Sequence, residues 1–507
     1  MSDSNWENRE VDRDNLERHL EMECKKRGIT RRDVMKGGMA AAAAVGLGTL
    51  FAACGGDDDS SSSEPAPAAD PEPASPPAAA PAEAVEPFKG TLNVTGLGVD
   101  LIDPIKEIAE RDLGFTLAFD ATDTITSQQK ILTQPDSIDV WSGYAHEYDR
   151  IWPSGNLLPI ATSSITNWAQ ISNIHKLGKL DPASTVCTPG QGDAFFRQMY
   201  LDPDNTGAWP TSPEVAEELR GEAVQWVDET TGETVGPEPS FIKGVPQNFN
   251  MDSVGYNQDV IPLEPEEVSW GELFNEAYSG RVALLADPSI AYQDAGNAAQ
   301  ALGLIEFETL GNLTRDEIDG LTQIMIDLKQ RGHFRGFWTT FDESVNLMSS
   351  GEVVIESMWS PAVALLVIQG VNVRYAAPPE GFRGWGALTG LPAHLADDPS
   401  KLDAALRYVN WWHSGEPGAI MMRQGYYNAA QENTRAFATP EEWDFWFGGQ
   451  PAAVDLPGLT GQVGDVTAGQ VRDGGSFEDR GCRYSSWNSQ FAEAEYQVQR
   501  FNDFQAA

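Results

Sequence analysis

Residues 91–119 read TLNVTGLGVDLIDPIKEIAERDLGFTLAF and contain the pattern that decides the fold. Two short stretches, Thr91–Thr95 and Phe115–Phe119, are rich in residues that favour β-strands. Between them, residues 103–113 repeat apolar side chains at helical spacing, and the repeat stops at Gly114. Strand, helix and strand at this spacing predict parallel strands that are joined by a crossover helix.

The same patterns recur along the rest of the chain. Further strand and helix candidates lie at 137–141, 281–285, 313–331, 353–358 and 401–413. The chain has 507 residues, which is enough for about two to four domain-sized units, and no segment repeats with a fixed period. The sequence therefore predicts the α/β class, with parallel sheets flanked by helices.

The charge of the chain excludes one class of function. Basic residues number 34 and acidic residues 76, so the net charge is −42. Such a protein repels phosphate backbones, and we expect no nucleic-acid partner. Hydrophobic residues make up 41% of the chain, which is enough for a large core. An acid-rich surface favours a high-salt habitat, where ions screen self-repulsion; an acidic protein from ordinary salt is the alternative.

Residues 1–53 have the order of an export signal. The pair Arg31 and Arg32 precedes an apolar run of small residues over 37–53, and this arrangement resembles a twin-arginine signal. The run is short and weakly apolar for a membrane span. It ends in Leu-Phe-Ala-Ala before Cys54, which resembles a lipobox whose cysteine is lipidated. The alternative is a membrane anchor helix with an incidental cysteine.

Residues 54–87 are predicted to be a disordered acidic tether after the lipidated cysteine. They are almost entirely Ala, Pro, Asp, Glu and Ser, with Gly55 and Gly56 at the start and no basic residue. Proline stiffens such a chain, and like charges extend it. We therefore expect a soluble domain at the periplasmic or extracellular face, held to the membrane by the lipid on Cys54.

No catalytic, metal or nucleotide motif is found. Gly96-Leu97-Gly98 follows a strand candidate but lacks the third glycine of a dinucleotide site, so a tight turn explains it. The chain has no G-x-S-x-G, H-E-x-x-H or C-x-x-C motif, and six histidines are a small supply for acid–base chemistry. We expect no cofactor, no metal and no enzymatic activity.

Several motifs in segment 245–293 point to one family. Residues 245–257 end in Tyr256-Asn257, Ser269-Trp270 opens the next segment, and a run from Gly280 ends at Asp287. In this order the motifs resemble the spermidine/putrescine-binding proteins of ABC transporters. Further matches in the same order bring the resemblance to about residues 90–430: Asp139–Tyr144, Ser350–Trp359, Trp385 with Leu391-Pro392, Leu406–Trp412 and Gly425-Tyr426.

The resemblance implies a two-lobed periplasmic-binding-protein fold of type II. Each lobe would be a mixed sheet flanked by helices, with the ligand cleft between the lobes. The implied division of the chain is 88–250 for lobe 1 with an insertion at 200–243, 251–359 for lobe 2, 360–415 for a return to lobe 1, and 416–507 for C-terminal helices mainly in lobe 2.

The same resemblance implies a function in import. The protein would capture a small organic solute, such as putrescine, spermidine or a related amine, and deliver it to a membrane permease with its ATPase. It is expected to act as a monomer. A hinge motion that closes the lobes would bury the solute.

The matched positions supply candidate ligand contacts. Aromatic faces suit the methylenes and ammonium groups of an amine, and a hydroxyl or a carboxylate can accept its hydrogen bonds. The candidates are Tyr144, Phe249, Trp359, Trp385, Ser142 and Asp287. Core packing is the alternative for the four aromatic residues, a turn for Ser142, and a helix cap for Asp287.

Two acids of the family pattern are missing. Ala387 and Ile290 stand where polyamine-binding proteins carry carboxylates. Ammonium groups buried without a partner would cost about 2–5 kcal/mol each. A smaller, less charged or zwitterionic solute is therefore also compatible with the sequence.

Other functions compete with this one. Adjacent tyrosines, Tyr426 and Tyr427, resemble the phenolate ligands of ferric-iron-binding relatives. An exported hydrolase would suit the many carboxylates and the 15 tryptophans, although no catalytic motif supports it. A structural surface protein is the third alternative.

The cysteines leave one question open. Cys24 lies in the signal and Cys54 would be acylated, so Cys187 and Cys482 remain. An oxidising compartment permits a disulfide between them, and two free thiols are the alternative.

Overall fold

The computed structural model describes residues 88–507 apart from 182–183, 185, 189 and 202–235. The signal with Arg31 and Arg32, the tether with Cys54, and most of the expected 200–243 insertion therefore lie outside the described residues. In the described part, no helix has the length and apolar character that a membrane span requires.

The first lobe begins with the predicted strand–helix–strand unit. Strand β1 (Thr91–Leu97) pairs in parallel with β2 (Thr116–Thr122) and with β3 (Val140–Tyr144), and helix α3 (Asp103–Leu113) connects the first two. Helix α4 (Thr124–Thr133) follows β2. Gly114 ends α3 with a φ of 74°, a left-handed conformation that favours glycine. The crossover predicted from residues 91–119 is confirmed.

The second lobe repeats this arrangement. Strand β8 (Val282–Leu285) pairs in parallel with β9 (Phe334–Trp338) and with β10 (Ile355–Met358). Three helices, α9 (Pro288–Ala301), α10 (Arg315–Gln330) and α11 (Phe341–Ser349), lie between these strands in the sequence. A capping box of Thr314 and Glu317 fixes the start of α10.

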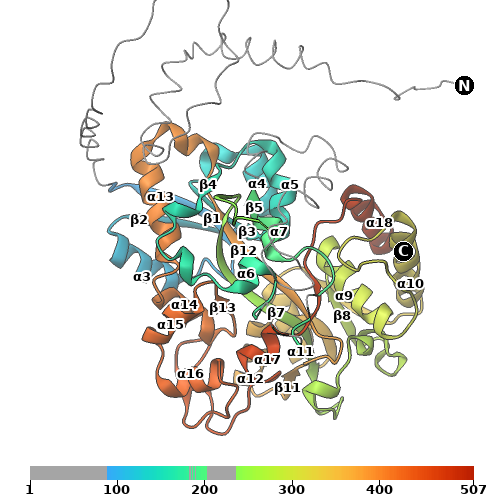
Figure 1. Cartoon of the computed structure of the whole chain (residues 1–507). Coiled ribbons are helices and arrows are strands. Elements are labelled where there is room, and N and C mark those ends of the chain that lie inside the picture. Colours follow the sequence, from blue (N-terminus) through green and yellow to red (C-terminus); the bar gives the residue numbers. More distant parts are fainter. Residues whose placement is uncertain (1–87, 182–183, 185, 189, 202–235) are drawn as a thin grey trace, which may run out of the picture. The chain divides into compact units, whose positions relative to one another are not determined.

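One long strand joins the two sheets. Strand β7 (Val245–Asn257) pairs with β12 (Phe382–Gly390) through its first part, and with β10 and β11 (Val373–Tyr375) through its last part. The sheet order is β2-β1-β3-β12-β7-β10-β8-β9. In Figure 1, β7 lies between the strands of the first lobe and those of the second. The two-lobed α/β fold is thereby confirmed.

The C-terminal third of the chain contributes to both lobes. Helix α12 (Ser360–Ile368) packs on α11, so the chain returns to the first lobe only at β12. Helices α13 (Pro399–Trp411) and α14 (Glu416–Arg423) pack on α3. Strands β13 (Tyr427–Asn428) and β16 (Tyr484–Trp487) pair with β7 and β12, respectively.

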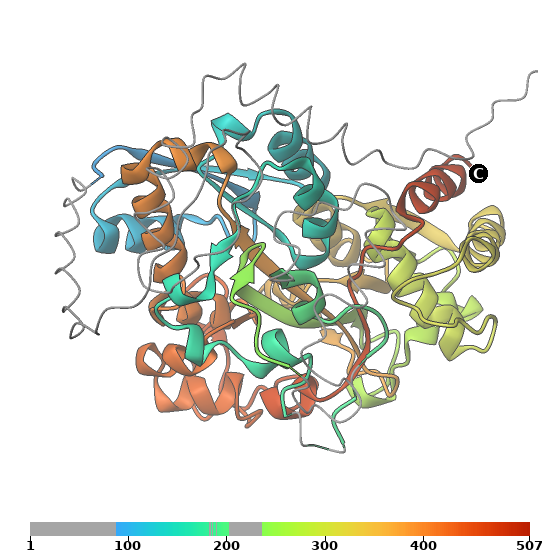
Figure 2. The same cartoon turned by 45° about the horizontal axis from the view of Figure 1, so that its top comes forward.

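The last helix of segment 416–507 packs on the second lobe. Helix α18 (Ala494–Ala506) packs on α9 and α10, and in Figures 1 and 2 it lies beside these yellow helices at the C-terminus. Its side chains Phe501 and Phe504 belong to the buried core of that lobe. Helices α16 (Pro440–Trp446) and α17 (Phe477–Gly481) belong to the same segment.

Cys187 and Cys482 form a disulfide that links positions 295 residues apart. Neighbouring hydrogen bonds hold the same two segments together, since the backbone N–H of Thr188 donates to the carbonyl oxygen of Cys482 at 2.9 Å. The bond therefore links the segment near residue 187 to the end of helix α17, just before β16.

Reduction of this disulfide should lower the free energy of unfolding by about 2–4 kcal/mol, because the unfolded chain regains the entropy of a long open loop. Chemical denaturation with and without reductant measures the change. A Cys187→Ser/Cys482→Ser variant is the control and should show no effect of the reductant. Equal stability of the oxidised and reduced parent would contradict the prediction.

Candidate functional site

A cavity of about 790 Å³ lies where the two sheets face each other. From the first lobe it is lined by residues at the carboxyl ends of β1, β2 and β3, and from the second lobe by residues at the ends of β8, β9 and β10. These residues are Leu97, Thr122 and Tyr144, and Leu285, Thr339 and Trp359. The carboxyl ends of parallel strands are the usual place for a ligand in open α/β sheets, and here two such edges face one space.

Five helices begin at this cavity. Helices α3, α4, α9, α11 and α12 have their N-cap residues in its lining, namely Ile102, Asp123, Asp287, Thr340 and Trp359. Each helix N-terminus carries a partial positive charge and free backbone N–H groups. The cavity therefore has an electropositive backbone wall.

Among the described residues, two charged side chains line the cavity, Asp123 and Asp287. Both act as helix caps. Asp123 accepts from the backbone N–H of Thr126, and Asp287 accepts from those of Ser289 and Ile290. The second oxygen of Asp287 accepts from Thr124 Oγ1 at 3.2 Å, which links the two lobes across the cavity. The negative charge in the cavity is thus partly compensated before any ligand binds.

Three of the six candidate ligand residues line this cavity, and they are Tyr144, Asp287 and Trp359. Trp359 is half-buried, and its ring stands edge-on to Trp338 with 5.0 Å between the centroids. Packing on Trp338 fixes the indole at the end of β10, so one of its sides is free to face the cavity. Asp287 has the cap role as well as a place in the lining.

Trp385 and Ser142 lie one layer behind the cavity. The Trp385 ring is 2% exposed and packs edge-on against Tyr144 and Tyr426, with 5.2 Å between the centroids in each pair. Ser142 Oγ donates to Gln247 Oε1 at 2.9 Å inside the sheet. Trp385 thus supports Tyr144, and neither Trp385 nor Ser142 is among the residues that line the cavity.

Phe249 lies away from the cavity, in an aromatic cluster. Its ring packs against His175, Phe195, Tyr427 and Phe477, and it has no exposed surface. The structure therefore places Phe249 in the core, which is the alternative that the sequence left open.

The adjacent tyrosines do not converge on one point. The Tyr426 ring packs on Trp385, whereas the Tyr427 ring packs on Phe249, Phe447 and Phe477. The two rings therefore belong to different aromatic clusters, which does not favour joint binding of one ion. Among the described residues, no group of three or more His, Cys, Asp or Glu could hold a metal.

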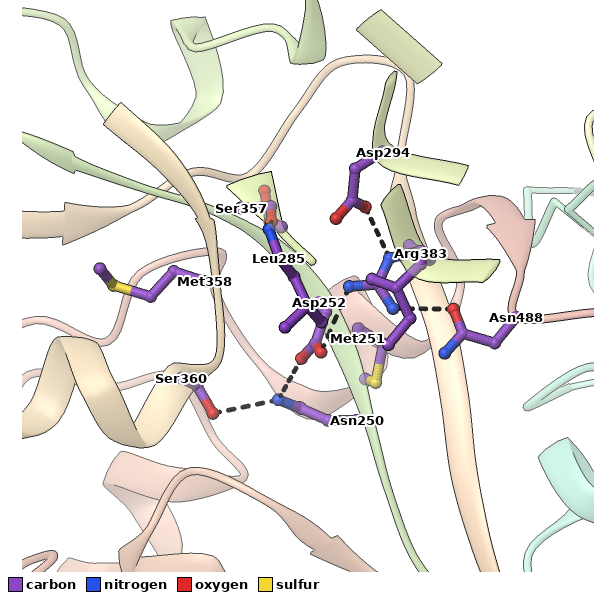
Figure 3. A network of polar contacts seen from close by, with 12 residues as sticks. Asn250, Met251, Asp252, Leu285, Asp294, Ser357, Met358, Ser360, Arg383 and Asn488 are labelled. Carbon is purple, nitrogen blue, oxygen red and sulfur yellow. Dashed lines mark hydrogen bonds and ion pairs between the residues drawn. The ribbon is translucent and has the colours of Figure 1, made fainter. Parts of the chain in front are cut away.

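A buried ionic network connects the lobes beside the cavity (Figure 3). Arg383 Nε donates to Asp294 Oδ1 at 2.7 Å, and Arg383 Nη1 donates to Asn488 Oδ1 at 2.7 Å. Arg383 Nη2 lies 3.6 Å from Asp252 Oδ2. Because these residues come from β12, α9 and β7, the network fixes the sheet of the first lobe to a helix of the second.

The network continues toward α12. Asn250 Nδ2 donates to Asp252 Oδ1 at 3.1 Å and to Ser360 Oγ at 3.0 Å. Burial raises the pKa of Asp252 to about 6, against the opposing effect of the Arg383 charge. The sequence did not predict this network, although Asn248, Asn250 and Asp252 alternate along β7.

Two further buried acids stand near the lobe interface. Asn248 Nδ2 donates to Asp100 Oδ1 at 2.7 Å, and burial raises the pKa of Asp100 to about 7. Glu147 accepts from the backbone N–H of Tyr144 at 3.0 Å and from Gln128 at 2.9 Å. Burial raises the pKa of Glu147 to about 8, and the charge of Asp287 adds to the effect. Glu147 therefore positions Tyr144 as a neutral acid at pH 7.

This raised pKa predicts how stability depends on pH. The unfolded Glu147 ionises near pH 4.5 while the folded one stays protonated up to about pH 8, so the free energy of unfolding falls as the pH rises between these values. The slope from one such group is at most about 1.4 kcal/mol per pH unit. Histidines whose pKa is lowered by burial, such as His146 at about 4, titrate below pH 6.5.

Denaturation between pH 6.5 and 8.5 measures the effect. The Glu147→Gln variant should lose less stability over this range than the parent, because the amide cannot ionise. Parallel curves for the two proteins would show that Glu147 does not titrate in this range.

Leu459 and Gln424 also line the cavity, and the sequence did not predict either of them. Leu459 lies in the turn between β14 (Leu456–Pro457) and β15 (Val463–Val466). Asp465 holds this turn, since its carboxylate accepts from the backbone N–H of Thr460 at 2.8 Å. No sequence signal links this turn to strand ends more than 100 residues away.

Comparisons with known proteins agree with this architecture. The profile of a family described as bacterial extracellular solute-binding protein matches residues 104–443. A putative spermidine/putrescine ABC transporter from Listeria monocytogenes has a similar structure, with a TM-score of 0.51 and 12% identity over 82% of this chain and 98% of that one. No curated protein sequence matches the chain.

A second solved structure has the same fold. It is the spermidine/putrescine ABC transporter substrate-binding protein PotD from a strain of Streptococcus pneumoniae, crystallised with calcium and HEPES. The TM-score is 0.50, and the identity is 12% over 82% of this chain and 99% of that one. At this identity the likeness establishes the two-lobed fold alone.

Proposed function

Because the chain belongs to the bacterial extracellular solute-binding proteins, we propose that it captures a small organic solute in the cavity between its lobes and delivers it to an ABC permease. The strongest support is that the carboxyl ends of strands from both lobes line one cavity of about 790 Å³. Tyr144 and Trp359 are the aromatic contacts, and Asp287 is the acidic one.

The solute is an amine of low net charge. Aromatic faces and Asp287 favour an ammonium group, whereas five helix N-termini favour an anionic group. At the positions where the family pattern has further carboxylates, this chain has Ala387 and Ile290. Ala387 is fully buried in the sheet, and Ile290 is 2% exposed. A zwitterion, such as an amino acid or a betaine, satisfies both charges. A polyamine like those in the names of the two similar structures is the runner-up.

A thermal-shift screen tests this proposal. The classes to compare are polyamines, amino acids, quaternary amines and small acids, each at saturating concentration. A ligand that binds only the folded state adds about 2.7 kcal/mol to the free energy of unfolding when its concentration is 100 times its Kd. The melting temperature rises as a result. A shift with no member of these classes, or turnover of a sugar substrate, would contradict the proposal.

Export and membrane anchoring belong to the same proposal. The protein is exported by the twin-arginine route through Arg31 and Arg32, and a lipid on Cys54 anchors it as a monomer at the outer face of the membrane. The acidic Pro/Ala segment 54–87 then holds the binding domain away from the membrane surface.

Replacement of Cys54 by alanine should release the protein in soluble form, because it removes the only side chain that the lipobox offers for acylation. Fractionation of cells that express the parent or the Cys54→Ala variant measures this. Cys24→Ser is the matched control and should stay in the membrane fraction. Equal membrane binding of Cys54→Ala and the parent would contradict the lipid anchor.

A further inference from the structure

A second cavity, of about 660 Å³, lies on the other side of α12 from the first cavity, which is the proposed solute cleft. Its walls come from α12, from β11, from the end of α16 and from residues 467–473. Within the described part of the chain, Gln424 alone lines both cavities. The wall on α12 is apolar, with Val363, Ala364 and Val367, and Trp446 extends it.

Arg472 lines this cavity and lacks an acidic partner. Its side chain is 9% exposed, and Nη2 donates to Tyr427 Oη at 2.8 Å and to the carbonyl oxygen of Gly425 at 3.3 Å. Nη1 is buried and has no hydrogen-bond partner, and no described carboxylate lies within 4 Å of the guanidinium. In a chain with a net charge of −42, a buried arginine without a carboxylate is unusual.

The neighbouring groups do not supply the missing anion. The carboxylate of Asp473 is taken by Arg374, whose Nη2 lies 2.6 Å from it, and by the backbone N–H of Tyr375 at 2.8 Å. Aromatic rings stabilise the cation from two sides, since Arg472 lies 5.2 Å from the centroid of Tyr427 and 4.8 Å from that of Trp446. Burial lowers the pKa of Arg472 only to about 10, so the group stays charged at pH 7.

A second buried arginine in this cavity also lacks a full set of hydrogen-bond partners. Arg480 lines the cavity and is 2% exposed, and its two Nη groups donate to the carbonyl oxygens of Asp473 and Met251. Its Nε has no partner in the described part of the chain. The exposed Glu264 and Glu266 also line the cavity, and their charges disfavour an anion with more than one negative charge.

We propose that this cavity binds a monocarboxylate with an apolar chain or ring. The carboxylate pairs with Arg472, which supplies a buried cation and an unused donor. The apolar body lies against the valines of α12 and against Trp446. The site is separate from the solute cleft, so a second molecule can be bound while the cleft is occupied.

Isothermal titration of the full chain with hexanoate and with phenylacetate tests this site. Hexylamine is the control ligand, with the same apolar body and the opposite charge, and should not bind here. Arg472→Met should weaken carboxylate binding about 10- to 100-fold, because it removes a charged hydrogen-bond donor and keeps the apolar volume.

Two further variants keep the test decisive if Arg472→Met does not fold. Ala364→Phe fills the cavity from α12 and keeps Arg472, and should abolish the binding. Trp359→Ala alters the solute cleft and should leave the binding unchanged. Absence of carboxylate binding to the parent, binding that persists in Ala364→Phe, or loss in Trp359→Ala would each overturn the proposal.

Discussion

Replacement of Trp359 by alanine should weaken binding of the solute about 30-fold or more and leave the melting temperature of the unliganded protein nearly unchanged. The indole is half-buried and faces the cavity at the end of β10, so its removal takes away a ligand contact and little core packing. A buried aromatic anchor at the centre of a binding site is typically worth about 2 kcal/mol or more. Calorimetry with the solute found by the screen measures the change.

Trp385 provides the matched control. It is 2% exposed and packs behind Tyr144 and Tyr426, so Trp385→Ala should lower the free energy of unfolding by about 3–5 kcal/mol. Its effect on binding should follow from the loosened Tyr144 and be smaller than that of Trp359→Ala. If Trp359→Ala destabilises the protein as much as Trp385→Ala and spares binding, Trp359 is a core residue.

The second large effect is expected at Arg383. Arg383→Met should destabilise the protein by about 3–5 kcal/mol, because Asp294 and Asp252 would remain buried without a cation. The loss should shrink at acid pH, where both carboxyl groups accept protons and no longer need the arginine. Denaturation at pH 7 and at pH 5 measures both parts of this prediction.

An exposed arginine serves as the comparison. Arg111 bridges α3 and α14 through Glu416, and its side chain is 55% exposed. Arg111→Met should leave the unfolding midpoint almost unchanged, because water and salt screen such a pair. Equal effects of Arg383→Met and Arg111→Met would contradict the account of the buried network.

The sequence predicted the lobes well because their strands and helices are local patterns. Residues 91–119 contain a complete crossover unit, and the second lobe repeats the pattern from residue 281. The places of Tyr144, Asp287 and Trp359 follow from the same logic, since each stands just after or at the end of a strand whose carboxyl end faces the cavity. Their role in binding stays a prediction.

The faces of β7 could not be predicted in the same way. Twelve of its 13 residues are buried, so alternation between polar and apolar residues does not separate a cleft face from a core face. Phe249 is therefore a ligand candidate by sequence, although its ring packs in the core. Leu459 and Arg472 could not be predicted for another reason. Long-range packing alone brings the turn with Leu459 and the loop with Arg472 to the cavities.

A crystal structure of the chain with the solute that gives the largest thermal shift tests the central claim most directly. The account predicts one solute molecule between the lobes, in contact with Trp359 and Tyr144 and within hydrogen-bond distance of Asp287. A solute bound outside this cavity, with the strand ends of β3 and β10 free of contacts to it, would contradict the claim.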